Sequence, residues 1–393
     1  MIKREKYLKV IREFYDSDLV KIITGIRRCG KSTILKEIIN EISKKTSDII
    51  FIDFEEASNL YLIPDDISLI NYVYENRKSD FTYVFLDEVQ RVKNWSSAVR
   101  TLRLKNISVF ISGSNSKLLS REFTNELSGR FVSFRVRPFV YKELCEYANE
   151  LKKEISITDY IIWGGFPKRL ELDSLNAQKI YLNELNDTII LNDIISRYNI
   201  RKIEVFKSIV NFIMLSNSRA YSVRSITNYI KTNGLPCSVA TVSKYISYLE
   251  EAFVVELVQE YSNKIKAKLG YYNKIYLEDV SLNSIRVINS KYDITHNFEN
   301  IVYNELIYMG YNVSVYKKGQ QEIDFFASKD NKGYLIQVAY SIVDEKTYER
   351  EFVLFNKLDN SNQKIIITND ELDYSTSTVR HIKFKDFLLM KEL

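Results

Sequence analysis

The chain is poor in the residues that build flexible linkers, disulfides and zinc sites. Its 393 residues include only 11 Gly, 4 Pro, 3 Cys and 2 His. So few glycines and prolines leave little room for long linkers, and no internal repeat or low-complexity tract stands out. Cys29, Cys145 and Cys237 are far apart and share no ligand spacing with His296 or His381. The sequence therefore indicates neither a zinc site nor a disulfide framework.

Long apolar runs are also missing. The N-terminus, residues 1–6, is charged and is not followed by the apolar segment of a secretory signal, and no run is long enough to span a bilayer. We therefore expect a soluble, cytoplasmic protein without a membrane partner. With 45% hydrophobic and 27% charged residues, the chain is long enough for two or three domains, each with its own core.

The charge is nearly balanced overall but uneven along the chain. A formal net charge of +5 is too small to indicate a polyanionic partner by itself. Residues 201–290, however, carry 12 Lys or Arg against 7 Asp or Glu, so this segment accounts for the whole excess. It is the candidate for nucleic-acid contact.

The rest of the chain is organised around a phosphate-binding loop. An apolar run, Val20–Thr24, predicts a buried strand, and the amphipathic stretch Ile34–Ile42 predicts a helix. Between them the spacing G-x-x-x-x-G-K-[ST] predicts a loop that binds ATP through Gly25, Ile26, Arg27, Arg28, Cys29, Gly30, Lys31, Ser32 and Thr33. Its backbone N–H groups can surround a polyphosphate, Lys31 can reach the terminal phosphates, and the Ser32 hydroxyl can ligate Mg²⁺.

Acidic and polar residues follow two further predicted strands. Residues 81–86 lead into Asp87 and Glu88; Asp87 can hold Mg²⁺, and Glu88 can polarise an attacking water. Asn115, after the strand at 107–113, can reach the γ-phosphate or that water; alternatively it caps the next helix. A strand is also expected at 48–53. Strands that alternate with helices predict a parallel three-layer α/β sheet, whose ligands gather at the carboxyl ends of the strands.

Arg130 is the candidate cation for the transferring phosphoryl group. It follows Gly129 in a polar loop and would act as a finger or sensor in its own chain or in a neighbouring one; otherwise it forms a surface ion pair. Arg135 and Arg137, on the next strand, are the alternates. A finger supplied by a neighbour would imply a ring or a dimer.

These motifs resemble a known family. Together with residues 86–95, 112–115 and 164–167 (Gly-Gly-Phe-Pro), they are similar to the AAA-type, archaeal-ATPase-like ATP-binding proteins of bacteria and archaea. The resemblance implies an α/β P-loop ATPase core at 1–155, joined to a C-terminal domain of poorly defined function. It also implies catalytic roles for Lys31, Glu88, Asn115 and Arg130. Residues 156–200 would form a helical lid.

Residues 201–290 have the order of a winged helix-turn-helix. Two helices, 221–230 and 238–250, precede strand-like runs at 253–258 and 271–277. Double-stranded DNA would be contacted by Lys244 on the second helix and by three lysines between the strands, Lys264, Lys266 and Lys268. One lysine on the second helix argues against strong base reading, so a protein-contact module is the alternative.

Residues 291–393 resemble a PD-(D/E)xK nuclease that lacks part of its chemistry. A helix at 297–306, strands at 312–316, 322–327, 333–340 and 364–368, and a helix at 345–357 carry Glu305, Asp324 and Gln337 as a vestigial metal set. Ala339 occupies the position of the catalytic lysine, so we expect a docking shell and no cleavage. Overall the sequence predicts a Mg²⁺-dependent ATPase that moves these modules on DNA, or alternatively a slow nucleotide-gated switch or scaffold for a protein partner.

Overall fold

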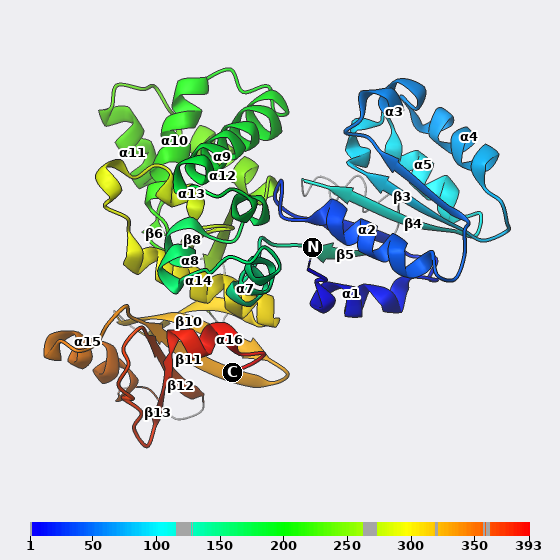
Figure 1. Ribbon diagram of the computed structural model, residues 1–393. Coiled ribbons are helices and arrows are strands. Elements are labelled where there is room, and N and C mark those ends of the chain that lie inside the picture. Colours follow the sequence, from blue (N-terminus) through cyan, green and yellow to red (C-terminus); the bar gives the residue numbers. More distant parts are fainter. Residues whose placement is uncertain are drawn as a thin grey trace. The chain divides into compact units, whose positions relative to one another are not determined.

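The computed structural model describes residues 2–114, 127, 129–261, 273–318, 321–356, 358 and 362–393. The chain forms two compact units (Figure 1). The first comprises residues 1–138 with 251–253, and the second comprises 139–250 and 254–393. The first unit thus ends at Pro138 and not near residue 155, because helix α7 (Tyr141–Glu150) packs within the second unit, where the Tyr141 N–H donates to Glu305.

The first unit contains the predicted parallel sheet. Its five strands have the order β2-β3-β4-β1-β5, and every pairing is parallel. Their bounds are β1 Val20–Thr24, β2 Ile49–Asp53, β3 Thr82–Asp87, β4 Ile107–Gly113 and β5 Phe131–Arg135. The P-loop α/β fold expected from the sequence is therefore confirmed.

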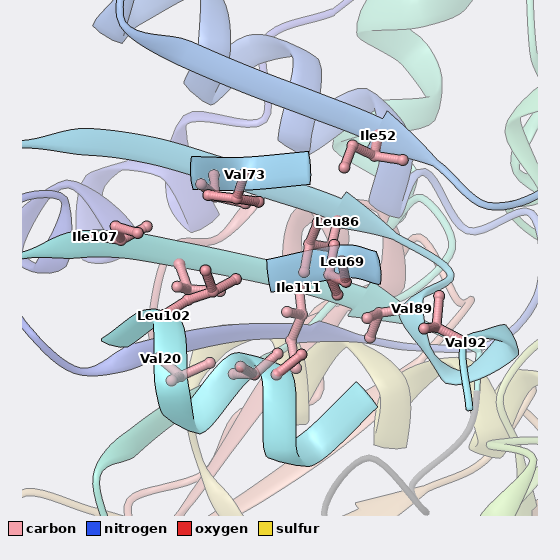
Figure 2. Close-up of a cluster of buried hydrophobic side chains, with 14 of the residues drawn as sticks. Val20, Ile52, Leu69, Val73, Leu86, Val89, Val92, Leu102, Ile107 and Ile111 are labelled. Carbon is pink, nitrogen blue, oxygen red and sulfur yellow. The ribbon is translucent and has the colours of Figure 1, made fainter. Parts of the chain in front are cut away.

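Helices cover both faces of this sheet (Figure 1). They are α1 Glu5–Ile11, α2 Lys31–Ile42, α3 Ala57–Leu62, α4 Asp66–Asn76 and α5 Trp95–Arg103, with 3₁₀ turns η1 Arg12–Phe14 and η2 Val89–Arg91. Side chains alternate along the strands, so Val20, Leu86 and Ile111 join Leu69 of α4 and Leu102 of α5 in one apolar cluster (Figure 2).

The second unit begins with helices and a small sheet. Its helical elements up to residue 290 are α7, α8 Ile157–Trp163, η4 Pro167–Glu171, α9 Leu175–Thr188, the π-helix η5 Ile189–Ser196, α10 Ile203–Leu215, α11 Val223–Thr232, α12 Val239–Glu251, α13 Ser281–Ser284 and η7 Ile288–Ser290. Strands β6 Ala220–Tyr221, β7 Val255–Gln259 and β8 Asn273–Leu277 form an antiparallel sheet of order β6-β8-β7.

A second five-stranded sheet completes this unit. Helix α14 (Ile294–Met309) leads into β9 Asn312–Lys318, β10 Gln321–Lys329, β11 Lys332–Val338, helix α15 Glu345–Asn356, β12 Gln363–Thr368, β13 Val379–Lys383 and helix α16 Phe384–Leu389. The order is β13-β12-β11-β10-β9; β9 to β11 pair antiparallel and β11 to β13 parallel. Each predicted element is present, while β13 and α16 were not predicted.

The Gly-Gly-Phe-Pro motif has a structural explanation. Gly164 has φ 64°, and a Cβ on it would lie 1.9 Å from an Asp279 carboxylate oxygen. A Cβ on Gly165 would lie 1.9 Å from the Phe139 carbonyl oxygen, and the Gly165 N–H donates to buried Asp279 at 2.7 Å. Side chains are therefore excluded from this turn. Among the described helices, none is long and apolar enough to cross a membrane.

Candidate nucleotide site and the other predicted sites

The predicted phosphate loop lies at the carboxyl end of β1. Gly25 follows the strand with φ 149°, and a Cβ there would lie only 2.1 Å from the Val136 carbonyl oxygen. Gly30 has φ 103° and is the N-cap of α2, which begins at Lys31. Both glycines are thus required by backbone geometry. The loop amides and the start of α2 lie where a polyphosphate would gain from the helix dipole.

Lys31 is buried, and its shortest hydrogen bonds within the described residues are to backbone carbonyls. Its side chain is 5% exposed, and Nζ donates to the carbonyl oxygens of Gly25 and Ile26 at 3.2 Å each. The nearest recorded carboxylate oxygen, Oε1 of Glu88, is 3.9 Å from Nζ. The ammonium is therefore held by weak, neutral acceptors, which a phosphate oxygen can replace with a charge-assisted hydrogen bond.

Asp87 is the buried last residue of β3. It is 2% exposed, and Ser112 of β4 donates its hydroxyl to Oδ1. Burial raises the pKa of Asp87, hydrogen bonds from Ser112 and Ser32 oppose this, and the charges of Glu88 and Asp53 add to it. A serine hydroxyl bonded to a carboxylate offers the hard oxygen ligands that Mg²⁺ prefers, so Ser32 and Asp87 fit the predicted metal role.

Two residues that were given no role in the sequence analysis orient Glu88. The Glu88 N–H donates to the Ser112 hydroxyl at 3.2 Å, so one serine contacts both acidic residues. Glu88 itself has φ 52°, and its Oε2 accepts a hydrogen bond from the Gln90 side chain. Gln90 and Ser112 lie within the segments 86–95 and 112–115 that resemble the family. Their spacing alone does not show which polar side chain points toward Asp87 and Glu88.

Arg4 supports the loop from a distant part of the sequence. It is 3% exposed, and its Nη1 donates to the Cys29 carbonyl at 3.1 Å and to the Arg137 carbonyl at 2.8 Å. It thereby ties the loop to the segment after β5. No sequence pattern links residue 4 to the loop, so this contact could not be predicted.

The other loop residues have different environments. Ile26 and Cys29 are buried, and Arg27 pairs with Glu55 at 3.2 Å. Arg28 is exposed with φ 65°. Thr33 is partly buried in the first turn of α2.

Arg130 and Arg135 lie at opposite ends of the sheet's strands. Arg130 is exposed, and its carbonyl accepts from the N–H of Val20, the first residue of β1. The phosphate loop follows the other end of this five-residue strand, roughly 15 Å away. Arg135 pairs with Thr24 at the loop edge, and its guanidinium lies over the Phe253 ring at 4.9 Å. Asn115 lies outside the described residues.

Among the DNA-contact candidates, only Lys244 is within the described residues. It is exposed on α12, with Nζ 5.8 Å from the centre of the Tyr248 ring. Tyr248 in turn stacks on Tyr198 with ring centres 3.6 Å apart. Lys264, Lys266 and Lys268 lie outside the described part.

The structure divides the predicted nuclease set. Asp324 and Gln337 are neighbours, since the Asp324 N–H donates to Gln337 Oε1 at 3.3 Å. Glu305 does not join them; its carboxylate accepts from the Tyr141 N–H at 3.0 Å and the Tyr160 hydroxyl at 3.3 Å. These contacts of Glu305 are with α7 and α8, and its place in the metal set stays a prediction. Glu299, six residues earlier on α14 and on another side of that helix, approaches Asp324 instead.

Comparison with known proteins agrees with this geometry. Residues 17–145 match the family model of an AAA domain, and residues 154–290 and 295–387 match two domains of unknown function, DUF8612 and DUF4143. A solved structure, the Walker-type ATPase of Pyrococcus abyssi, aligns with 73% of this chain and 96% of its own at a TM-score of 0.51 and 16% identity. The first unit is thus an AAA-type P-loop domain, the fold of ATP-binding proteins.

Full-length relatives extend the match to the whole chain. An uncharacterised protein of Haemophilus influenzae is 31% identical over 379 residues, covering 94% of this chain and 93% of its own. The uncharacterised protein MJ1544 of Methanocaldococcus jannaschii is 32% identical over 393 residues, covering 94% and 86%. The chain belongs to one family with these two proteins.

Proposed function

We propose that the protein is a Mg²⁺-dependent ATPase that hydrolyses ATP to ADP and phosphate. The observation that carries the proposal is the position of Lys31. Its ammonium lies 3.9 Å from the Glu88 carboxylate and, among the described residues, donates weakly to two backbone carbonyls. Such an arrangement suits a triphosphate and a metal ion better than it suits a permanent ion pair.

The proposed roles follow from these contacts. Lys31 and the loop amides bind the β- and γ-phosphates, while Ser32 and Asp87 would hold Mg²⁺, which when bound neutralises charge on the phosphate oxygens. Glu88, oriented by Gln90, positions a water for in-line attack and accepts its proton. Asn115 is proposed to contact the γ-phosphate or that water.

Arg130 is proposed to act only in an oligomer. Because it is exposed and pairs with the start of β1, it is too far from the loop of its own chain. A role at the phosphoryl group would therefore require Arg130 from a neighbouring copy, in a ring or a dimer.

The later segments are proposed to be modules moved by the ATPase: a helical lid at 156–200, a winged helix at 201–290 and a nuclease-like domain at 291–393. The order α10-β6-α11-α12-β7-β8 and the antiparallel three-stranded sheet support the winged-helix assignment. Double-stranded DNA would be contacted by Lys244 on α12, with Lys264, Lys266 and Lys268 taking phosphates. Nucleotide state would then be coupled to DNA contact.

One observation favours the second candidate, a nucleotide-gated switch or scaffold that binds a protein. The predicted DNA-reading helix presents a single lysine, and Tyr248 on it is stacked against Tyr198 and so is not free to reach a base. Winged helices with few cations serve as protein-contact modules.

The experiment compares ATP hydrolysis by the wild type and Lys244→Ala, with and without duplex DNA, at 50 and 200 mM salt. We expect DNA stimulation that falls steeply with salt, because phosphate contacts release counterions, and that is weaker in the variant. Lys207→Ala, which removes a lysine from α10, is the matched control. Hydrolysis that is indifferent to DNA at both salt concentrations would favour the protein-binding switch.

A further inference from the structure

A buried lysine in the second unit lies among three carboxylates from two elements. Lys274 belongs to β8, and its Nζ lies 2.9 Å from Glu322 and from Asp324 of β10 and 3.0 Å from Glu299 of α14. We call these four residues the Lys274 cluster. The Lys274 side chain is 6% exposed. All three hydrogen atoms of the ammonium thus have a carboxylate acceptor.

The surrounding groups hold the carboxylates in place. The Tyr276 hydroxyl donates to Glu299 Oε1 at 2.7 Å, and the Val338 N–H donates to Asp324 Oδ2 at 3.0 Å. Burial raises the pKa of Glu299, and the neighbouring Asp324 charge raises it further. Burial lowers the pKa of Lys274, but the charges of Asp324, Glu299 and Glu322 together raise it above its ordinary value, so the lysine stays charged. The cluster therefore contains one ammonium for three carboxyl groups.

The cluster occupies the place where the sequence suggested vestigial metal chemistry. Asp324 and Gln337 belong to that predicted set, and Ala339, two residues after Gln337, lacks the expected ammonium. Lys274 brings an ammonium to Asp324, the one member shared by the predicted set and the cluster, from a different sheet. Carboxylate oxygens are the ligands that a hard divalent cation prefers. Here they surround an ammonium instead, and within the described residues, with that ammonium in place, no group of three or more His, Cys, Asp or Glu is arranged to hold a metal ion.

We propose that Lys274 is the built-in cation of this cluster, so that its ammonium excludes a divalent metal from the second five-stranded sheet and fixes the three-stranded sheet against it. A metal ion could enter only by expelling a buried ammonium that has three charge-assisted hydrogen bonds, and the entering metal ion would also have to lose its own hydration shell. The second unit then has no metal-dependent hydrolytic centre here. This inference does not depend on ATP hydrolysis by the first unit.

The test removes the ammonium and then offers a metal. Each protein carries Asp87→Asn, which removes the candidate metal ligand of the first unit, and its melting temperature is measured with and without millimolar Mn²⁺. We expect Lys274→Met to melt roughly 10 °C below its parent, because buried carboxylates lose their counter-ion. Mn²⁺ should restore most of that loss and leave the parent unchanged. The matched control is Lys317→Met, because Lys317 contacts the same Glu322 at 3.6 Å from the outside; it should change neither property.

Two results would overturn the proposal. The first is a Lys274→Met protein that folds but gains no response to Mn²⁺, because the ammonium then does not stand at a cation position. The second result needs no variant at the lysine. It is Mn²⁺ binding by the parent that electron paramagnetic resonance detects and that Asp324→Asn abolishes. Mg²⁺-dependent DNA nicking by the wild type that Asp324→Asn abolishes would count equally. This second result remains decisive if Lys274→Met fails to fold.

Discussion

Two buried lysines, one in each unit, stand next to carboxylates and yet are held very differently. Lys31 donates to two backbone carbonyls and lies 3.9 Å from Glu88, whereas Lys274 contacts three carboxylates at 2.9 to 3.0 Å. The first ammonium can exchange its acceptors for phosphate oxygens at little cost. The second already has the strongest acceptors that a protein supplies. We therefore propose that the same pair of residue types forms a binding site in one unit and a structural ion cluster in the other.

The largest expected effect comes from removing each of the two lysines in turn and comparing the loss of ATP affinity. Lys31→Ala should weaken ATP binding by at least about 100-fold, since charge-assisted hydrogen bonds of about 1.5–3 kcal/mol each are lost. Lys274→Met should leave ATP affinity within about 3-fold, since Lys274 belongs to the other unit and screening by salt weakens long-range effects of charge. Isothermal titration with a non-hydrolysable ATP analogue measures both. Equal losses in the two variants would contradict the distinction between an open and a saturated lysine.

Ser112 tests how the acidic pair of the open site is positioned. Ser112→Ala removes the hydroxyl that contacts both Asp87 and the Glu88 N–H, so kcat should fall roughly 10-fold while KM for ATP changes less. Ser108→Ala is the matched control, because it removes another buried β4 hydroxyl that contacts Lys21 and the Tyr15 carbonyl. If both variants lost kcat equally, the effect would reflect strand packing and not positioning.

Arg4 tests whether the open site needs support from the N-terminal segment. Arg4→Met should weaken ATP binding by roughly 10-fold, because the Cys29 carbonyl loses a charge-assisted hydrogen bond that holds the loop. Arg4→Lys should recover part of this loss. Arg12→Met, a change in the same segment that breaks pairs with Glu5 and Glu41, should not affect binding. Fluorescent-nucleotide titration gives all three affinities; an unchanged Arg4→Met would remove Arg4 from the site.

A third buried lysine, Lys21, extends the comparison to stability. Its Nζ contacts the Ser17 carbonyl and the Ser108 hydroxyl, and burial lowers its pKa from 10.5 to about 7. Between these values the unfolded chain holds a proton that the folded chain lacks, so stability should rise with pH from about 7 to about 10, by up to about 1.4 kcal/mol per unit.

Lys21→Met should remove this slope and should be the more stable protein below pH 7. Urea unfolding of both proteins at pH 7, 8 and 9 gives their free energies of unfolding. The difference between the two proteins at each pH cancels the contribution of other groups such as Glu299. Parallel lines for the two proteins would show that Lys21 does not titrate in this range.

The sequence predicted what depends on local pattern. Apolar runs located β1 to β4, and the spacing of glycines, Lys31 and the Asp87–Glu88 pair located the edge of the sheet where the site lies. Those signals are local because a loop that surrounds phosphate needs its glycines and lysine in sequence. Contacts between distant segments were missed: Arg4 at the loop, and Lys274 with Glu299. Pairing across 25 or more residues depends on how elements pack, and packing leaves no periodic signal.

The two acids of α14 show what the order of elements does not reveal. Both Glu299 and Glu305 lie on α14, and either could be assigned to the vestigial metal set from the sequence. That Glu299 shares Lys274 with Asp324, while Glu305 contacts Tyr141 and Tyr160, depends on how the helix packs. The same limitation applies to Arg130. The end of the sheet at which it lies is known only from the register of β5 on β1.

The most direct test of the open site is steady-state ATP hydrolysis by the wild type and Glu88→Gln in the presence of Mg²⁺, with ATP affinity measured on the same samples. The account predicts that Glu88→Gln binds ATP as tightly as the wild type and hydrolyses it at least about 100-fold more slowly, because the group that positions and deprotonates water is lost. Hydrolysis by Glu88→Gln at the wild-type rate would contradict the proposed ATPase site.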